Sequence, residues 1–385
     1  MSYLEYTVKS VPTGLRKVLY VNWALVILLF TVCAVGFLML YSVAGGSMEP
    51  WAEPQMERFA MGIVVMFAVA FTPIWFWRNM AGAAYLVGLA LLVLVMLVGS
   101  VGMGAQRWIN LGFMRLQPSE VMKIALVMML AAYYDWLDPK KVSRPFWVLI
   151  PVVLIIVPTV LVLKQPDLGT AILLLLGGAV VMFCAGVSLW YFGGVAALGA
   201  GLVTLVMMSR GKSWQLLKDY QFKRIDIFLD PGSDPLGAGY HIMQAKIALG
   251  SGGWAGRGYL QGTQSRLNFL PEKQTDFIFT TLGEEFGFVG AISLLVLYVL
   301  IIAFCISAAM QTKDRFSALL ILGVAATFFF YFAVNMAMVM GLAPVVGVPL
   351  PLVSYGGGGG GSAMLVLLGA FGLVQSAHIH KPRGR

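Results

Sequence analysis

An acidic residue, Asp276, stands at the border between a polar segment and a long apolar run that begins at Phe277. A carboxylate at such a border is partly removed from water, which raises its pKa and makes it a better general base near neutral pH. The same position also suits the N-cap of the helix that follows. Glu284 and Glu285 lie deeper in the run, where we expect at least one of them to face protein, either paired with a cation or neutral.

A second polar cluster surrounds the start of another apolar run, with Arg107 a short distance before it. Glu120 and Lys123 are three residues apart, so on a helix they share a face and can form an ion pair. Pro118 suits the first turn of that helix. The cluster fits two interpretations, a structural ion pair between helices or the polar wall of a substrate cavity.

Two turn-forming segments complete the polar interruptions. In KQPDLGT, either Asp167 caps the next helix or Lys164 offers positive charge to an anionic ligand group. In GLAPVVGVPLPLVSYGGGGGG, which follows Asn335, prolines exclude a regular helix. Irregular backbone at membrane depth needs protein or water to cover it. This segment is therefore either a re-entrant connector or part of a cavity wall that carries Ser354.

These clusters stand out because the rest of the chain is apolar. Of its 385 residues, 59% are hydrophobic and 11% are charged, whereas a soluble domain has about 45–50% and about 25%. The net charge of +9 comes from basic residues in loops between apolar runs, which indicates membrane topology and contact with anionic lipid rather than nucleic acid. Cys33, Cys184 and Cys305 lie inside apolar runs without paired spacing, as expected of buried hydrophobic residues.

The apolar runs predict an all-α polytopic membrane protein with about ten transmembrane helices, each of about 20 residues. The first run is long enough to be a retained helix rather than a cleaved signal peptide. Charges near its start weaken the fourth span, and the eighth and ninth are long enough to tilt or break. The predicted spans are 21–42, 59–77, 80–101, 119–136, 146–163, 168–187, 189–208, 277–310, 316–341 and 362–380.

The distribution of lysine and arginine predicts that both termini are cytoplasmic. In that orientation the inside segments hold twelve lysines and arginines against four in the short outside segments, and the first outside loop carries Glu49, Glu53 and Glu57. The short outside segments hold only Arg58, Arg107, Arg115 and Lys164. We treat residues 1–385 as one membrane domain.

A large extracytoplasmic loop, 209–276, is expected between the seventh and eighth helices. Long loops cross the membrane largely regardless of their charge, so its basic residues are compatible with this side. Its aromatic residues and glycine turns favour an ordered structure. The stretch 214–229 alternates apolar and basic residues, which suits a short helix on the membrane surface.

Signatures of several other classes are absent from the sequence. It contains no Walker loop, no dinucleotide-binding signature and no zinc-ligand spacing. The three histidines are His241, His378 and His380, and none suggests a Ser-His-Asp arrangement on the outer side.

Together the polar motifs resemble the SEDS family (shape, elongation, division and sporulation), from the first span to the C-terminal tail. The last of the motifs favours the RodA branch of the family over the FtsW branch. The matching strings are RWINLG…LQPSEVMKIALV, KQPDLGTA, FLDP…DPLGAGYH, GRGYLQGTQSRLNFLPEKQTDFIF…EEFGFVG and PVVGVPLPLVSYGG.

The resemblance implies a peptidoglycan glycosyltransferase of the bacterial inner membrane with ten membrane helices. Such a protein polymerises lipid II into a nascent glycan strand at the outer face. It works with a class B penicillin-binding protein and with other membrane proteins of the elongation machinery that maintains rod shape. The essential aspartate of the family matches Asp276, and its buried charged residues match Glu120, Lys123, Lys164 and Asp167.

The chemistry of the reaction suggests roles for these residues. Glycosyl transfer needs a base for the acceptor hydroxyl and cationic help for the departing pyrophosphate. We expect Asp276 to deprotonate the 4-hydroxyl of the acceptor sugar in an inverting displacement. Arg107, Lys164 or Arg266 would hold the pyrophosphate, with or without a divalent cation such as Mg²⁺ or Mn²⁺, and Ser354 would line the substrate site. We assign no protein metal site.

Two other functions remain open from the sequence. A lipid II flippase or another transporter also fits broken helices with buried charges, and a scaffold without catalysis would have no need of a desolvated carboxylate beside cations. One feature departs from the family pattern, because six glycines, 356–361, precede Ser362. Such a run is flexible and a poor helix former, which leaves the placement of Ser354 open.

Overall fold

Ten long helices in the described part of the chain lie where the apolar runs predicted membrane spans. The computed structural model describes residues 14–102, 105–110, 112, 115–216, 219–230, 232, 234, 238–267, 272–356 and 362–380. The ten helices are α1 (Trp23–Val43), α2 (Ala52–Phe71), α3 (Ile74–Val98), α4 (Pro118–Trp136), α5 (Pro145–Lys164), α6 (Leu168–Ala185), α7 (Leu189–Ser209), α11 (Ile278–Met310), α12 (Arg315–Val339) and α13 (Ser362–Ile379). Short 3₁₀ helices cover Gly14–Tyr20 and Pro139–Lys141.

Nine of these described helices are long and apolar enough to cross a membrane, and α4 is not among them. The exception has a structural reason. Helix α4 packs against α3, α5, α6, α12 and α13, so most of its side chains face protein rather than lipid. A helix in that position can carry Glu120 and Lys123, which are buried, because partner side chains replace water around the charges.

The predicted boundaries of the second and third spans are wrong. The chain breaks at Thr72 and Pro73, and α2 begins at Ala52 rather than at residue 59. Glu53 and Glu57 therefore lie on α2 and not in a loop. The apolar run continues across the break, so hydropathy does not reveal it, although Pro73 blocks a continuous helix.

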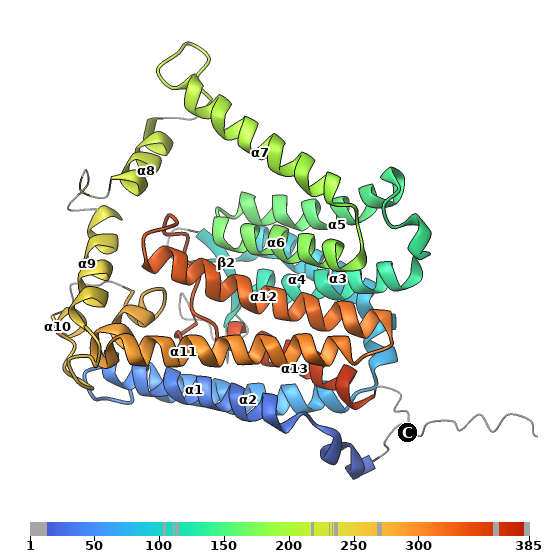
Figure 1. Cartoon of the computed structure of the whole chain (residues 1–385), viewed down its shortest axis with the longest axis horizontal. Helices are drawn as coiled ribbons and strands as arrows, with labels where there is room; N and C mark the ends of the chain where they lie inside the picture. Colours follow the sequence, from blue (N-terminus) through green and yellow to red (C-terminus); the bar gives the residue numbers. More distant parts are fainter. Residues whose placement is uncertain are drawn as a thin grey trace, which may run out of the picture.

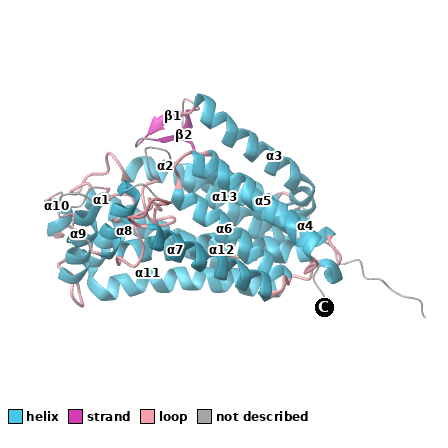
Figure 2. Cartoon of the chain, turned by 90° about the horizontal axis from the view of Figure 1, so that it is seen from above, coloured by secondary structure: helices cyan, strands magenta, loops and turns pink. Residues whose placement is uncertain are grey.

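The long helices run roughly side by side, while α7 stands apart from the bundle (Figure 1). Helix α7 has only Ser209 buried. The described helices of the predicted long loop, α8 (Asp219–Leu229), α9 (Ala238–Ser251) and α10 (Thr263–Arg266), gather at one end of the bundle (Figures 1 and 2). The predicted surface helix 214–229 is therefore shorter than expected, and its residues 217–218 lie outside the described part. The glycines 357–361 and the basic residues Lys9, Lys381, Arg383 and Arg385 also lie outside it.

A small antiparallel sheet, which the sequence did not predict, follows α3. Its strands β1 (Ser100–Gly102), β2 (Ala105–Asn110) and β3 (Arg115–Leu116) pair in the order β1-β2-β3. Figure 2 shows β1 and β2 above the ends of the helices. Strand β2 carries Arg107, and β3 leads directly into α4, so the sheet sets the position of Arg107 relative to the start of α4.

Two tyrosines compensate for two prolines inside α5. Proline has no N–H, so Pro151 and Pro158 leave the carbonyl four residues earlier without its helical partner. The hydroxyl of Tyr133 donates to the carbonyl of Trp147 (2.8 Å), and that of Tyr85 donates to the carbonyl of Leu154 (2.9 Å). These are the two carbonyls that the prolines leave free. In a membrane no water could take that role.

Replacing Tyr85 with phenylalanine is expected to destabilise the protein by about 1–3 kcal/mol, because the carbonyl of Leu154 would lose its donor in a segment where no water can replace it. The matched control is Tyr134→Phe, since the hydroxyl of Tyr134 is buried and has no hydrogen-bond partner among the described residues. Thermal unfolding of both variants in the same detergent measures the difference. Equal unfolding temperatures for the two variants would contradict the compensation.

Helix α11 breaks at Gly287, whose φ of 64° and ψ of −159° are not helical. The break agrees with the prediction that the eighth span can break. Backbone of the preceding loop satisfies the freed groups, because Arg257 N and Gly258 N donate to the carbonyls of Glu284 and Glu285, at 3.0 Å each. A Cβ on Gly287 would lie 2.3 Å from Gly256 N, so only glycine permits this approach.

Candidate active site

A cavity of about 110 Å³ gathers polar residues from separate parts of the chain. Four of the site residues predicted from the sequence line it, namely Arg107, Glu120, Asp167 and Asp276. The other polar and backbone groups in its wall are Trp108, Gln117, Thr170, Glu272, Thr275, Tyr331 and the turn Gly347–Pro349. Tertiary structure thus brings together four positions that are far apart in the sequence.

Asp276 is half-buried and lies just before α11. Burial raises the pKa of its carboxyl group to about 6, and the negative charge of Glu272 adds to the effect. The N-cap of α11 is Phe277, without a side-chain cap, so Asp276 does not take the capping role. Among the described residues no side chain or backbone donor bonds to its carboxylate, which leaves the group available to a ligand.

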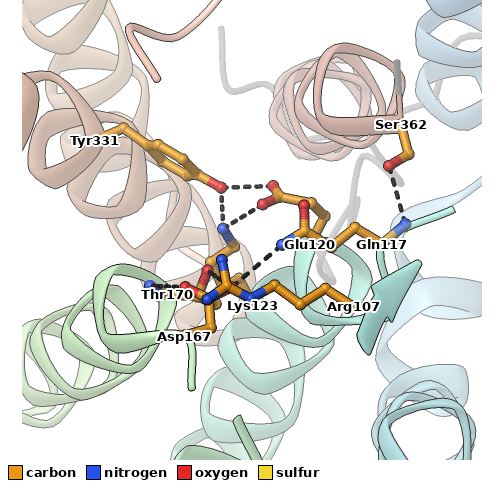
Figure 3. A network of polar contacts seen from close by, with 8 residues as sticks. All are labelled: Arg107, Gln117, Glu120, Lys123, Asp167, Thr170, Tyr331 and Ser362. Carbon is orange, nitrogen blue, oxygen red and sulfur yellow. Dashed lines mark hydrogen bonds and ion pairs between the residues drawn. The ribbon is translucent and has the colours of Figure 1, made fainter. Parts of the chain in front are cut away.

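Glu120, Lys123 and Tyr331 form a buried polar network (Figure 3). Glu120 accepts from Lys123 Nζ at 2.8 Å and from the Tyr331 hydroxyl at 2.5 Å. Lys123 Nζ also contacts the Tyr331 hydroxyl and lies 4.2 Å from the centre of its ring. Through Tyr331 the pair joins α4 to α12, and Glu120 also lines the cavity, so the geometry is compatible with either interpretation of the pair.

Asp167 caps α6 and helps to hold Arg107 at the cavity (Figure 3). Its carboxylate accepts from Thr170 N at 3.1 Å and from the Thr170 hydroxyl at 3.0 Å. Arg107 Nε lies 3.9 Å from the carboxylate and donates to the carbonyl of Gln165 at 3.3 Å, while its Nη2 contacts the carbonyl of Pro166. The Arg107 side chain keeps 29% exposure, so part of its guanidinium can meet an anion.

Other predicted site residues lie elsewhere. Lys164 and Arg266 are exposed at the ends of α5 and α10, outside the cavity lining. Lys123 lies behind Glu120 and lines a smaller neighbouring cavity. The Ser354 hydroxyl is buried and already bonded, because it donates to the carbonyl of Thr275 at 2.5 Å and accepts from Leu350 N at 2.8 Å.

Two residues of the cavity wall were not singled out from the sequence. Tyr331 lies four residues before Asn335 on the same helix, and this spacing places two polar side chains on one helical face. Glu272 stands four residues before Asp276 in a polar stretch. The i, i+4 spacing was a usable signal for Tyr331, whereas Glu272 lies in a turn where no periodicity applies.

Two buried carboxylates of α11 bond to segments outside the cavity. Glu284 Oε1 accepts from Thr263 N at 2.7 Å, from the Thr263 hydroxyl at 2.8 Å and from Gln264 N at 3.1 Å. Glu285 accepts from the hydroxyl of Ser42 on α1. Both carboxylates therefore face protein, as expected, and both hold α11 to neighbouring segments with hydrogen bonds from neutral donors.

Comparison with known proteins identifies relatives over almost the whole chain. The family model of the FtsW/RodA/SpoVE cell cycle proteins matches residues 22–383. The peptidoglycan glycosyltransferase MrdB of Escherichia coli K12 is 42% identical over 93% of each chain.

Solved structures share the fold. A chain from a study of how a peptidoglycan synthase complex coordinates polymerisation and crosslinking aligns with a TM-score of 0.77 and 32% identity, over 93% of this chain and 97% of that one. The rod shape determining protein RodA of Thermus thermophilus aligns with a TM-score of 0.69 and 27% identity, over 94% and 98%.

Proposed function

This chain belongs to the SEDS family, the FtsW/RodA/SpoVE cell cycle proteins, and we propose that it is a peptidoglycan glycosyltransferase that polymerises lipid II during cell elongation. The names of its relatives support the activity and the elongation role. The single observation that carries the site is the half-buried carboxylate of Asp276, which faces the same cavity as the Arg107 guanidinium.

The proposed reaction is an inverting displacement at the anomeric carbon of one lipid-linked sugar. Asp276 takes the proton of the acceptor 4-hydroxyl as its oxygen forms a bond to that carbon. The bond from the same carbon to the pyrophosphate oxygen breaks, and the electron pair leaves with the pyrophosphate. Arg107 stabilises the negative charge that develops there. A carboxylate with a pKa near 6 is ionised at neutral pH and still basic enough to accept a proton.

A divalent cation would need ligands from the substrate. Within the described ranges no three Asp, Glu, His or Cys side chains lie close enough together to hold a metal ion. Mg²⁺ is commonly held by one or two carboxylates together with substrate phosphates, so the substrate pyrophosphate would supply most of the ligands and Asp276 would stay free to act as the base. When bound, the cation would neutralise charge on the leaving pyrophosphate.

Placement of the cavity at the outer face of the inner membrane completes the proposal, with both termini cytoplasmic. There it meets lipid II, the nascent strand and membrane lipid. The structural relative from a complex for polymerisation and crosslinking supports a class B penicillin-binding protein as partner. Elongation-complex membrane proteins would bind the same assembly.

The proposal predicts that the purified protein, in lipid nanodiscs with its penicillin-binding partner and labelled lipid II, makes polymer that is resolved as a ladder on a gel. Glycan strands would exclude a scaffold. A lipid II flippase would instead move labelled lipid between the leaflets of a vesicle without forming polymer. Movement of lipid II without a polymer ladder would therefore overturn the glycosyltransferase proposal.

The rate of polymer formation should depend on pH in a defined direction. The base must be deprotonated, so the rate is expected to rise as pH increases through about 6 and to level off above about 7. At pH 5 about one tenth of the base would be ionised, which corresponds to roughly a tenfold loss against pH 8. A rate that falls over this interval would contradict a carboxylate base.

A further inference from the structure

Three successive backbone carbonyls hold the turn that carries the Asp276 side chain. The carbonyl of Gln274 accepts from Tyr355 N at 2.9 Å, and that of Thr275 accepts from the Ser354 hydroxyl at 2.5 Å. The carbonyl of Asp276 itself accepts from Asn335 Nδ2 at 2.9 Å. We call these three donors the clamp. Two of them belong to the proline-rich segment and the third to α12.

Asn335 is the member of the clamp that connects the most elements. It is fully buried in α12, and its Nδ2 also donates to the carbonyl of Val348 at 2.7 Å. One amide group therefore joins the backbone of Asp276 to Val348, and both residues line the cavity. A fully buried amide in an apolar helix is unfavourable unless it forms hydrogen bonds. Here Nδ2 donates to both carbonyls, whereas Oδ1 has no partner among the described residues.

The clamp acts on the backbone and leaves the carboxylate unbonded. Among the described residues its three donors bond to backbone carbonyls of the turn and, for Asn335, also to that of Val348, but never to Asp276 Oδ1 or Oδ2. Gly347 lies on the other side of the carboxylate, where an added Cβ would be 3.7 Å from Asp276 Oδ2. The arrangement fixes the backbone that carries the Asp276 side chain. It leaves the carboxylate oxygens free to accept a proton from a ligand.

From this arrangement we propose that Asn335 is a positioning residue for glycosyl transfer, which holds Asp276 in reach of the acceptor hydroxyl by fixing its backbone. The inference rests on the proposed function. A misplacement of about 1 Å can lower a rate by about a hundredfold, so a backbone donor without contact to the substrate can control the chemical step.

The test is Asn335→Leu, which keeps a similar volume and removes the donor. The expected result is at least a tenfold lower kcat for polymerisation of lipid II, with KM within about twofold of the parent protein. The acid limb of the pH–rate profile should move to lower pH, because a released Asp276 becomes more hydrated and its pKa falls toward the ordinary value. A structural role alone would not move that limb.

The matched control is Thr327→Val in the same helix. Thr327 is also buried, but its hydroxyl bonds within α12, to the carbonyl of Gly323 at 2.9 Å. This variant is expected to keep both kcat and the pH profile. An Asn335→Leu protein with the parent kcat, or with a lower kcat and an unmoved acid limb, would overturn the inference.

Ser354 keeps the inference testable if Asn335→Leu does not fold. Ser354→Ala removes the donor to the Thr275 carbonyl, whereas Ser354→Thr retains a hydroxyl. The alanine variant should lower kcat and shift the acid limb, and the threonine variant should restore both. No difference between them would overturn the clamp. Failure of the parent protein to make polymer would instead overturn the proposed function, and not only the role of the clamp.

Discussion

Replacing Asp276 with asparagine is expected to reduce polymerisation of lipid II by at least about a hundredfold. General base catalysis contributes about 10²–10⁴-fold to a rate, and asparagine has the same size but cannot take up a proton. Substrate binding should change little, because Arg107, a partly exposed cation of the cavity wall, remains. Initial rates of polymer formation and binding of labelled lipid II in nanodiscs measure the two effects separately.

Asp226→Asn provides the matched control for this prediction. It makes the same chemical change in the polar segment before α11, at a partly exposed residue that bonds to Arg210 on α7's side of the loop. Its polymerisation rate should equal that of the parent protein. Full activity of Asp276→Asn would refute the base assignment, while normal lipid II movement with no polymer from either protein would favour a transporter.

Breaking the buried ion pair is expected to produce the largest loss of stability. Lys123→Met leaves the Glu120 carboxylate buried with only the Tyr331 hydroxyl. Removing one partner of such a pair costs about 3–5 kcal/mol, since the other charge remains buried and unpaired. Thermal unfolding in detergent should show a strongly lowered transition for Lys123→Met.

The double variant Glu120→Gln with Lys123→Met separates structure from function. It removes both charges, so much of the lost stability should return. If its polymerisation rate also returns, the pair is structural only. If the protein is stable but inactive, Glu120 contributes to the cavity as its polar wall. A double variant no more stable than Lys123→Met would contradict a coupled pair.

Hydropathy was sufficient to locate the membrane helices but not their ends. The run through residues 59–77 is apolar on both sides of the break at Pro73, and an average over such a run cannot show a change of direction. For helix α4, hydropathy underestimated a helix that does form. Its charges weakened the predicted span, yet the helix forms because its neighbours in the bundle surround it.

The local sequence did not decide which aspartates are helix N-caps. An aspartate before an apolar run suits a cap at both Asp167 and Asp276. In the folded chain Asp167 caps α6 and Asp276 does not cap α11. Residues far away in the sequence contact the turn before α11, because Asn335 and Ser354 donate to its carbonyls, and the local sequence does not show these contacts.

The sequence by itself determined the all-α membrane fold and the approximate spans, because hydrophobic length is a property of short segments, and the family motifs singled out Asp276 as the proposed base. Only the tertiary structure decided which charges share a cavity: Arg107, Glu120, Asp167 and Asp276 meet there, while Lys164 and Arg266 do not. Such meetings depend on how helices from distant parts of the chain pack and on which carbonyls need donors. No spacing along the chain encodes those contacts.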